Sequence, residues 1–171
     1  MDAKNIFFIG FMGAGKTTLA KKLANRLNRE FIDTDKEIEK TWNMSIPQIF
    51  SEHGELFFRT QESLLLNQLI KKKQNSIISV GGGLPCHNNN MKLMNDNGLT
   101  FYLKRPTKEL FQRLRNVKQS RPLIQALSDS ELSAFIEDKI KERSVFYEGA
   151  KVILTREQQN VKSLAELLSK L

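Results

Sequence analysis

The sequence predicts an α/β fold, in which helices cover both faces of a parallel β-sheet. Short apolar runs, such as residues 6–9 and 76–80, alternate along the chain with segments of helical periodicity, and this alternation is typical of βαβ units. A chain of 171 residues suits one domain with a sizeable core. The composition is ordinary for a globular protein, with 40% hydrophobic and 27% charged residues. We therefore expect one three-layer αβα domain over residues 1–171.

The bulk properties narrow the classes of function. The net charge is +8, from 27 basic and 19 acidic side chains, which suits either nucleic acid or an anionic small molecule. The basic residues carry no RNA-binding signature, so we favour the small molecule and expect no nucleic-acid partner. Neither a transmembrane run nor a signal peptide is predicted, and the one cysteine, Cys86, suits a reducing compartment. We expect a cytoplasmic monomer that does not bind membranes.

The first predicted strand and helix enclose the most informative stretch of the chain. Residues 6–9 form a short apolar run typical of a buried parallel strand. Over residues 18–28, leucines recur at helical spacing. Residues 10–18 fit G-x-x-x-x-G-K-[ST], the phosphate-binding P-loop. Strand, Gly-rich turn and helix form the arrangement that this motif requires.

The P-loop motif predicts a nucleoside triphosphate as a ligand. Its glycines allow backbone N–H groups to turn inward around phosphate oxygens, and the new helix adds its positive N-terminal end. Lys16 should reach the β- and γ-phosphates, and the Thr17 hydroxyl should ligate Mg²⁺. The alternative is a Gly-rich turn that binds nothing, which the flanking strand and helix disfavour. The predicted nucleotide-binding residues of the loop are Gly13, Ala14, Gly15, Lys16, Thr17 and Thr18.

Two carboxylates follow the second predicted strand, residues 30–33. Thr34 or Asp35 is expected to cap a helix that runs to residue 41. On an extended segment, Asp33 and Asp35 would point the same way, because side chains two residues apart share a face. Beside a nucleotide, one carboxylate can act in the outer shell of Mg²⁺ and the other can accept a proton from an attacking hydroxyl. The alternative is a solvated turn with a helix cap.

The remaining elements follow from capping residues, apolar runs and helical periodicity. In chain order, we expect a helix from Ser45 with Pro47 in its first turn, a break over residues 51–54, a helix over 55–73, a strand over 76–80, a helix over 89–95, a strand over 99–103, a helix over 106–116, a helix from Asp129 or Ser130 to residue 147, a strand over 151–154 and a helix over 161–170. Residues 117–127 are polar and contain Pro122, so we expect a mobile loop there.

Arg59 lies on the long predicted helix, four residues after Glu55 and three before Glu62. On a solvated face this spacing gives ordinary helix ion pairs, worth roughly a few tenths of a kcal/mol. Phe57 and Phe58 precede Arg59, which indicates a partly buried face. A desolvated arginine oriented by a glutamate is a good clamp for a substrate carboxylate. From the spacing alone, the two interpretations are equally good.

Three consecutive glycines, Gly81, Gly82 and Gly83, follow the strand predicted over residues 76–80. Glycines do not stabilise a strand end, because each costs backbone entropy. They do allow the backbone to approach a ligand closely, and the alternative is a flexible turn. Ser79 comes two residues before the run, where it could support Mg²⁺ in place of the aspartate of a usual Walker B strand.

Arginines gather around the loop expected over residues 117–127. Arg113 precedes this loop, Arg121 lies within it and Arg143 follows on the next helix. A mobile loop with an arginine beside a phosphoryl-transfer site suggests a lid that closes, excludes water and neutralises developing charge. The alternative is a surface arginine that serves only solubility. We expect Arg121 to be the arginine of such a lid.

These motifs in this order resemble the shikimate kinase family. The resemblance spans roughly residues 4–150 and rests on the P-loop, the D-x-D pair, F-R-x-x-E from residue 58, the glycine run and R-P-L from residue 121. It implies ATP- and Mg²⁺-dependent phosphorylation of the 3-hydroxyl of shikimate, in the pathway to chorismate and the aromatic amino acids. It also implies a five-stranded parallel sheet in the order 2-3-1-4-5, a lid over about 113–128 and a shikimate-binding helical region over about 35–62.

The resemblance further implies roles for individual side chains. Asp35 would bind the ring hydroxyls and accept the proton, and Asp33 would act through a Mg²⁺-bound water. Lys16 and Arg121 would contact the transferred phosphoryl group. Arg59 and Arg143 would hold the shikimate carboxylate, with Glu62 as the partner of Arg59. The substrate ring would lie against the backbone of Gly81, Gly82 and Gly83, and Phe50 and Phe58 would form the apolar wall of its pocket.

The sequence does not decide which residues contact adenine, and it leaves two rival functions to be weighed. Either Arg113 or Arg115 could contact adenine, and residues 155–160 lack the proline that the family often places after the last strand. The rival functions are a related small-molecule kinase, such as one acting on gluconate, and a nucleotide-binding module without transferase activity. The pair of carboxylate-binding arginines, Arg59 and Arg143, together with the three glycines favours shikimate over gluconate. The presence of Lys16, Asp33, Asp35 and Arg121, which phosphoryl transfer requires, argues against a module without transferase activity.

Overall fold

The computed structural model describes residues 4–118 and 122–170, which contain a five-stranded parallel sheet. The spatial order is β2-β3-β1-β4-β5, which confirms the predicted order. β1 is buried along its whole length, as expected for the central strand of a sheet covered on both faces. The strands are β1 (Asn5–Ile9), β2 (Phe31–Asp33), β3 (Ile77–Ser79), β4 (Gly98–Leu103) and β5 (Val152–Leu154).

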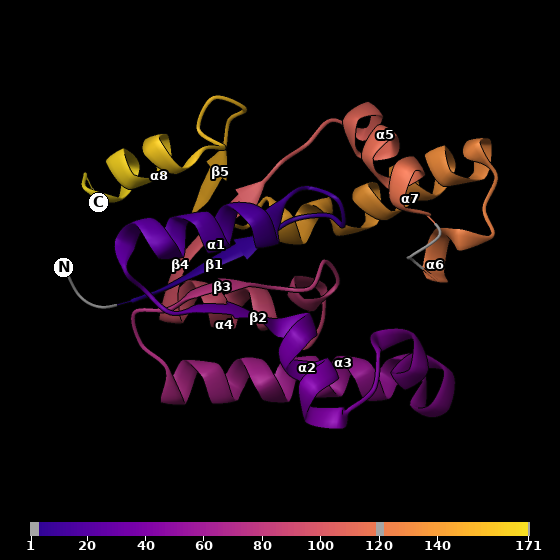
Figure 1. The fold of residues 1–171 in the computed structure, drawn as a ribbon, viewed down its shortest axis with the longest axis horizontal. Coiled ribbons are helices and arrows are strands. Elements are labelled where there is room, and N and C mark those ends of the chain that lie inside the picture. Colours follow the sequence, from indigo (N-terminus) through magenta and orange to yellow (C-terminus); the bar gives the residue numbers. More distant parts are fainter. Residues whose placement is uncertain (1–3, 119–121, 171) are drawn as a thin grey trace.

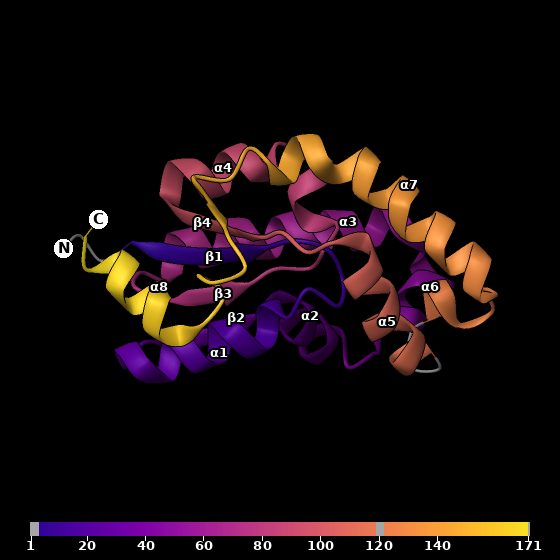
Figure 2. The ribbon, with the colours of Figure 1, turned by 90° about the horizontal axis from the view of Figure 1, so that it is seen from above.

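Helices cover both faces of the sheet, as the αβα prediction requires. Figure 2 shows α1 and α8 on one side of the sheet and α4 and α7 on the other, and α3 packs against α4. In Figure 1, α2, α5 and α6 lie toward the carboxyl ends of the strands. The helices are α1 (Lys16–Leu27), α2 (Thr34–Trp42), α3 (Ile46–Lys72), the 3₁₀ helix η1 (Leu84–Cys86), α4 (Asn90–Asn97), α5 (Thr107–Val117), α6 (Pro122–Gln125), α7 (Asp129–Tyr147) and α8 (Val161–Leu168).

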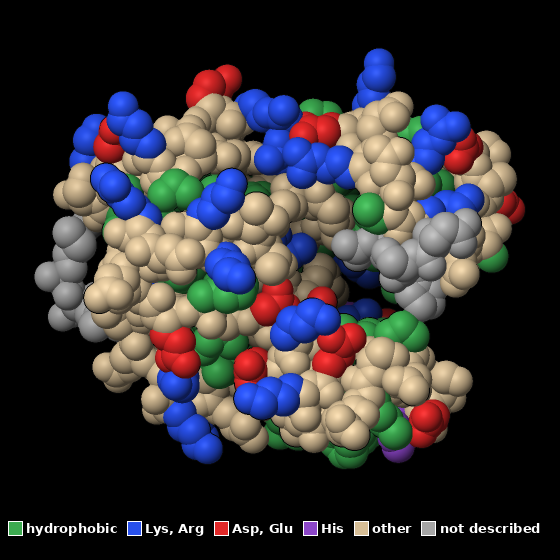
Figure 3. Space-filling view, viewed as in Figure 1, with side chains coloured by type: hydrophobic (Ala, Val, Ile, Leu, Met, Phe, Trp, Pro, Cys, Tyr) green, Lys and Arg blue, Asp and Glu red, His purple; other side chains and the backbone are tan. Residues whose placement is uncertain are grey.

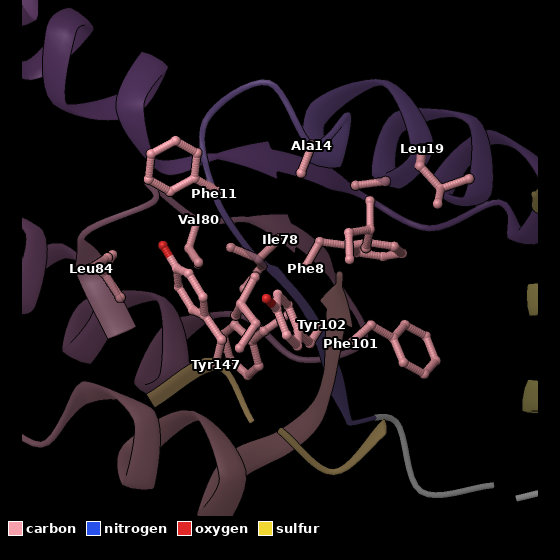
Figure 4. Close-up of a cluster of buried hydrophobic side chains, with 14 of the residues drawn as sticks. Phe8, Phe11, Ala14, Leu19, Ile78, Val80, Leu84, Phe101, Tyr102 and Tyr147 are labelled. Carbon is pink, nitrogen blue, oxygen red and sulfur yellow. The ribbon is translucent and has the colours of Figure 1, made fainter. Parts of the chain in front are cut away.

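The main core lies between the sheet and its helices (Figure 4). Phe8 of β1 and Phe101 of β4 are fully buried, and their rings meet edge to face at 5.5 Å, a favourable aromatic geometry. A second, smaller cluster joins α2 to α3 through Ile38, Ile49 and Phe58. The α2 and α3 region is therefore packed on its own apolar contacts beside the carboxyl end of the sheet.

Two helix caps differ from the prediction. Asp33, rather than Thr34 or Asp35, caps α2: its side chain accepts hydrogen bonds from the N–H groups of Asp35 and Lys36. The extended backbone of Asp33 (φ −114°, ψ 116°) is the conformation that a capping residue needs, whereas residue 34 is already helical. The two aspartates therefore do not share one extended segment. Ser128 likewise caps α7 in a capping box, where Asp129 or Ser130 was expected.

Three segments are more regular than the sequence indicates. The break predicted over residues 51–54 is confined to Gly54, whose φ of 82° interrupts α3. The loop predicted over 117–127 contains the short helix α6, and η1 follows the glycine run. The capping box at Ser45 and the proline in the first turn of α3 are confirmed. Within the two described ranges, none of the helices combines the length and apolar character needed to cross a bilayer.

Candidate active site

The P-loop connects the end of β1 to the start of α1, at the carboxyl edge of the sheet. Gly13 and Gly15 both have left-handed backbone conformations, with φ of 78° and 99°, which glycine adopts without strain. Lys16 is buried, and its Nζ donates hydrogen bonds to the carbonyl oxygens of Gly10 (2.9 Å) and Phe11 (3.1 Å). The lysine ammonium is therefore held inside the loop that was predicted to bind phosphate.

Three oxygen-bearing side chains meet beside the P-loop. The Thr17 hydroxyl donates to Asp33 Oδ2 at 2.8 Å and lies 3.2 Å from Ser79 Oγ. The register of the sheet explains the meeting, because Asp33 and Ser79 are opposite partners at the ends of β2 and β3. Carboxylate and hydroxyl oxygens with room for water fit Mg²⁺, which prefers oxygen ligands. The same three residues were predicted to surround the metal.

Two adjoining cavities lie over these residues. The smaller, of about 250 Å³, is lined by Ser79 and by the P-loop residues Gly13, Gly15, Lys16, Thr17 and Thr18. The larger, of about 510 Å³, lies between the P-loop side and the α2–α3 region, where Figure 3 shows the surface hollowed. Residues that line both cavities are Met12, Thr17, Asp33, Asp35 and Gly82. A phosphoryl donor bound in the smaller cavity and a phosphoryl acceptor bound in the larger one would therefore meet at Asp35.

Asp35 lies at this junction with one of its carboxylate oxygens buried. Its Oδ1 atom is inaccessible to solvent and has no hydrogen-bond partner within the described ranges. Burial raises the pKa of Asp35, and the nearby Asp33 raises it further, whereas Lys16 opposes the shift. A buried acceptor without a hydrogen-bond partner is costly, which is consistent with the raised pKa of this carboxyl.

The glycine run leaves space for the charged side chains of the site. A Cβ atom at Gly81 would lie 2.6 Å from Asp35 Oδ1 and 2.7 Å from Glu62 Oε1. A Cβ atom at Gly83 would lie 2.5 Å from Arg59 Nη1. The sequence predicted close approach of a ligand here. The structure adds that two of the three glycines also accommodate residues of the site itself.

We expect Gly83→Ala to weaken binding of the molecule that Arg59 contacts. The backbone of Gly83 (φ −87°, ψ −21°) accepts alanine without strain, so the new methyl group should displace the flexible guanidinium and leave the fold intact. Misplacement of a clamping group by about 1 Å can lower activity up to about 100-fold. The measurement is KM for the acceptor substrate, with the melting temperature recorded in parallel.

Gly149→Ala is the matched control for this substitution. The added Cβ would have Phe146 O as its nearest neighbour, at 3.2 Å, outside the cleft. This variant should keep its KM. An unaltered KM in folded Gly83→Ala would contradict the displacement of Arg59.

Arg59 lies on the partly buried face of α3 and lines the larger cavity. Its guanidinium donates to Glu62 at 2.7 Å and to Glu55 at 3.0 Å. The side chains of Arg59 and Glu62 are only 11% and 1% exposed, whereas that of Glu55 is 62% exposed. The guanidinium also lies over the rings of Phe50 and Phe58, at 5.8 and 5.3 Å. The structure therefore excludes the simple solvated ion pair that the spacing left open.

Glu62 should make the stability of the protein depend on pH. Desolvation raises the pKa of Glu62 from 4.5 to about 7, although Arg59 opposes the shift. The folded protein thus retains this proton over a range in which the unfolded chain has released it. The stabilisation is complete below the unfolded pKa of 4.5 and is lost as the pH rises through about 7. We expect this group to lower the free energy of unfolding by on the order of 2 kcal/mol between about pH 5 and pH 8.

Urea unfolding at both pH values measures this effect, and two variants isolate it. Glu62→Gln should reduce the pH dependence, because the titrating group is gone. Glu55→Gln removes the exposed carboxylate that contacts the same arginine and should leave the dependence in place. Equal pH dependence in the wild type and Glu62→Gln would exclude Glu62 as its source.

Arg143 of α7 reaches the same cavity from the opposite element. It lines the cavity together with Arg59 and the glycine run, and its guanidinium lies over the Phe11 ring at 5.8 Å. The two arginines that the sequence placed 84 positions apart therefore face one cavity, which suits an anionic ligand. Phe50 and Phe58 line this cavity as well.

The two arginines that precede the expected lid have different positions. Arg113 Nη1 donates to the carbonyl of Gly13 at 3.2 Å, so this side chain lies against the P-loop. Arg115 pairs instead with Asp129 at 2.9 Å. The geometry thus favours Arg113 for contact with a nucleotide, which the spacing had left undecided. Arg121 lies outside the described residues, and its placement stays a prediction.

The sequence did not indicate several side chains that hold the site together. The Thr34 hydroxyl, in the middle of D-x-D, accepts a hydrogen bond from the N–H of Gly81 at 3.0 Å. Ser63 Oγ accepts from Asn88 (2.9 Å) and Asn90 (3.0 Å) and donates to the carbonyl of Arg59. These bonds tie α3 to the segment after the glycine run. Threonine, serine and asparagine carry too weak a local signal to predict such long-range contacts.

Comparison with known proteins gives one consistent result. A model of the shikimate kinase family matches residues 12–171. A shikimate kinase from Azobacteroides pseudotrichonymphae is 42% identical over 165 residues, which cover 96% of this chain and 97% of that protein. The crystal structure of shikimate kinase from Bacteroides thetaiotaomicron has a TM-score of 0.90 at 41% identity, covering 97% of this chain and 98% of that one. Shikimate kinase from Acinetobacter baumannii, in complex with shikimate, has a TM-score of 0.85 at 34% identity, covering 98% and 91%.

Proposed function

This chain belongs to the shikimate kinase family, and on that premise we propose that it transfers the γ-phosphate of ATP to the 3-hydroxyl of shikimate. The products are ADP and shikimate 3-phosphate. ATP occupies the P-loop cavity, and shikimate occupies the larger cavity between the P-loop side and the α2–α3 region. No observation favours a gluconate kinase or a module without transferase activity.

The observation that carries this proposal is the position of Asp35, which lines both cavities where they adjoin. A hydroxyl of shikimate would donate its hydrogen bond to the Asp35 carboxylate. The carboxylate would then accept the proton as the hydroxyl oxygen attacks the γ-phosphorus. Its raised pKa suits a general base, since a base works best when its pKa approaches the operating pH.

Phosphoryl transfer depends mostly on positioning and on neutralising charge. In this proposal the N–H groups of the P-loop and Lys16 hold the phosphates. The Thr17 hydroxyl would ligate Mg²⁺, and Asp33 would contact it through water, with Ser79 in support. The ion would neutralise negative charge on the phosphates. Figure 1 shows why these groups converge, because the P-loop and α2 lie at the same edge of the sheet.

The arginine pair explains the choice of acceptor. Arg59 and Arg143 would hold the shikimate carboxylate, because both line the acceptor cavity and Arg59 is already oriented by Glu62. Guanidinium groups suit this task through paired N–H donors. The glycine run would lie against the ring, and the rings of Phe50 and Phe58 would form its apolar wall.

The nucleotide end of the site is proposed from the position of Arg113. We place adenine near this side chain, which contacts the P-loop carbonyl of Gly13. Arg121, by family resemblance, would meet the transferred phosphoryl group when the lid over about 113–128 closes. We further propose a cytoplasmic monomer, and size-exclusion chromatography with light scattering would test the oligomeric state.

ADP release with Mg-ATP tests the proposed function directly. The assay compares reactions with shikimate, with gluconate and without an acceptor. We expect turnover that depends on shikimate. Turnover with gluconate alone would keep the nucleotide site and overturn the assignment of the arginines. ATP binding without turnover on either acceptor would indicate a module without transferase activity.

A further inference from the structure

The backbone of the glycine run is held by side chains from two distant elements. Glycines lack side chains and lose much conformational entropy when they are ordered, so other residues must fix them. The N–H of Gly81 donates to the Thr34 hydroxyl at 3.0 Å, and the carbonyl of Gly82 accepts from the Tyr147 hydroxyl at 2.6 Å. Tyr147 lies at the end of α7, 65 residues from Gly82.

Tyr147 is fixed in the core with its hydroxyl at the site. The residue is 0% exposed, and its ring lies 5.2 Å from that of Tyr102. Figure 4 shows the Tyr147 hydroxyl directed to the segment between Val80 and Leu84. A buried phenol needs a hydrogen-bond partner, and the Gly82 carbonyl is that partner. The bond therefore fixes one end of α7 to the glycine run.

Arg143 lies one helical turn before Tyr147 and faces the same region. A Cβ atom at Gly82 would be 3.7 Å from Arg143 Nη1. The arginine also lies near the Tyr147 hydroxyl: burial raises the pKa of Tyr147, and Arg143 partly opposes this shift. The arginine, the tyrosine hydroxyl and the Gly82 carbonyl thus meet at one border of the larger cavity.

From these contacts we infer that Tyr147 is a positioning residue for the acceptor, which acts by holding Arg143 in place against the glycine run. This inference rests on the proposed function of the cavity. Tyr147 itself does not line the cavity, so it acts through its neighbours. Loss of its hydroxyl would free the Gly82 carbonyl and loosen α7 at Arg143. The acceptor should bind less tightly, because Arg143 lines only the larger cavity. ATP binding should change much less, because its main contacts are with the P-loop itself.

Tyr147→Phe tests the inference, because phenylalanine preserves the ring and removes only the hydroxyl. We expect KM for shikimate to rise about tenfold, which corresponds to about 1.4 kcal/mol, the size of one net hydrogen bond. KM for ATP should change less than about twofold, and kcat should change little. KM does not depend on the concentration of folded enzyme, so partial unfolding cannot imitate this result. Tyr102→Phe removes the hydroxyl of the neighbouring ring and should alter neither KM.

The combination with Arg143→Ala separates positioning from general loosening. If Tyr147 acts by positioning Arg143, its hydroxyl has little left to contribute once Arg143 is gone. Adding Tyr147→Phe to Arg143→Ala should then raise KM for shikimate by a further factor of less than about three. An unchanged KM in Tyr147→Phe, an equal rise for ATP, the same effect in Tyr102→Phe, or full multiplication in the double variant would each overturn the inference. If the wild type shows no shikimate-dependent turnover, the proposed function fails as well.

Discussion

Replacing Asp35 by asparagine is expected to lower kcat by about 10²- to 10⁴-fold, the usual contribution of a general base. Asparagine keeps the shape of the side chain but cannot accept the proton from the attacking hydroxyl. ATP binding should persist, because the phosphates are held by the P-loop and Asp35 is proposed to contact only the attacking hydroxyl. The fold should persist too, since the substitution removes the charge of a carboxylate whose Oδ1 atom is buried without a hydrogen-bond partner in the described ranges.

Steady-state kinetics together with a direct measurement of ATP affinity test this prediction. Glu37→Gln is the matched control, because it makes the same change of charge on α2 at a residue that does not line either cavity. The control should retain wild-type kcat. If kcat of Asp35→Asn stays within about tenfold of the wild type, Asp35 positions the hydroxyl and is not the base.

Arg59→Ala is expected to raise KM for shikimate by the equivalent of roughly 2–5 kcal/mol, the cost of truncating one partner of a buried charge pair. The substitution removes the proposed contact with the shikimate carboxylate and leaves Glu62, which is 1% exposed, without its arginine. The predicted loss falls mainly on shikimate binding, so KM for ATP should stay near the wild-type value. Initial rates with each substrate varied in turn give both constants.

Arg59→Lys refines the same experiment. Lysine keeps the positive charge but cannot offer the paired N–H donors that now contact Glu62 and Glu55. Its KM for shikimate should therefore lie between those of the wild type and Arg59→Ala. If Arg59→Ala has wild-type KM for shikimate, the arginine serves only the ion pair on α3.

Much of the fold follows from short stretches of sequence. Residues 6–18 predict strand, P-loop and helix in the positions observed, because apolar periodicity and the Gly-rich turn are local signals. Ser45 with Pro47 predicts the start of α3 for the same reason. The helix starts were predicted less accurately, because Asp33 and Ser128 cap their helices one residue before the first of the two expected positions in each case. Neighbouring Asp, Ser and Thr residues can all cap a helix, so composition alone does not choose among them.

The sequence proposes the members of the site but does not predict their geometry. The family pattern identified Asp35, Arg59 and Arg143 together, although nothing in their spacing shows that they line one cavity. The environment of Arg59 was undecided, since the same spacing serves a solvated ion pair or a buried clamp. Packing of α3 beside the glycine run decides in favour of the buried pair with Glu62.

The sequence by itself determined the P-loop, the parallel α/β architecture and the family, because each depends on residues close together or on an ordered set of motifs. Only the tertiary structure decided which oxygen of Asp35 is buried, why Gly83 must leave space for Arg59, and that Tyr147 holds Gly82. The physical reason is burial. Desolvation, missing hydrogen-bond partners and close packing arise only when segments distant in the chain are brought into contact.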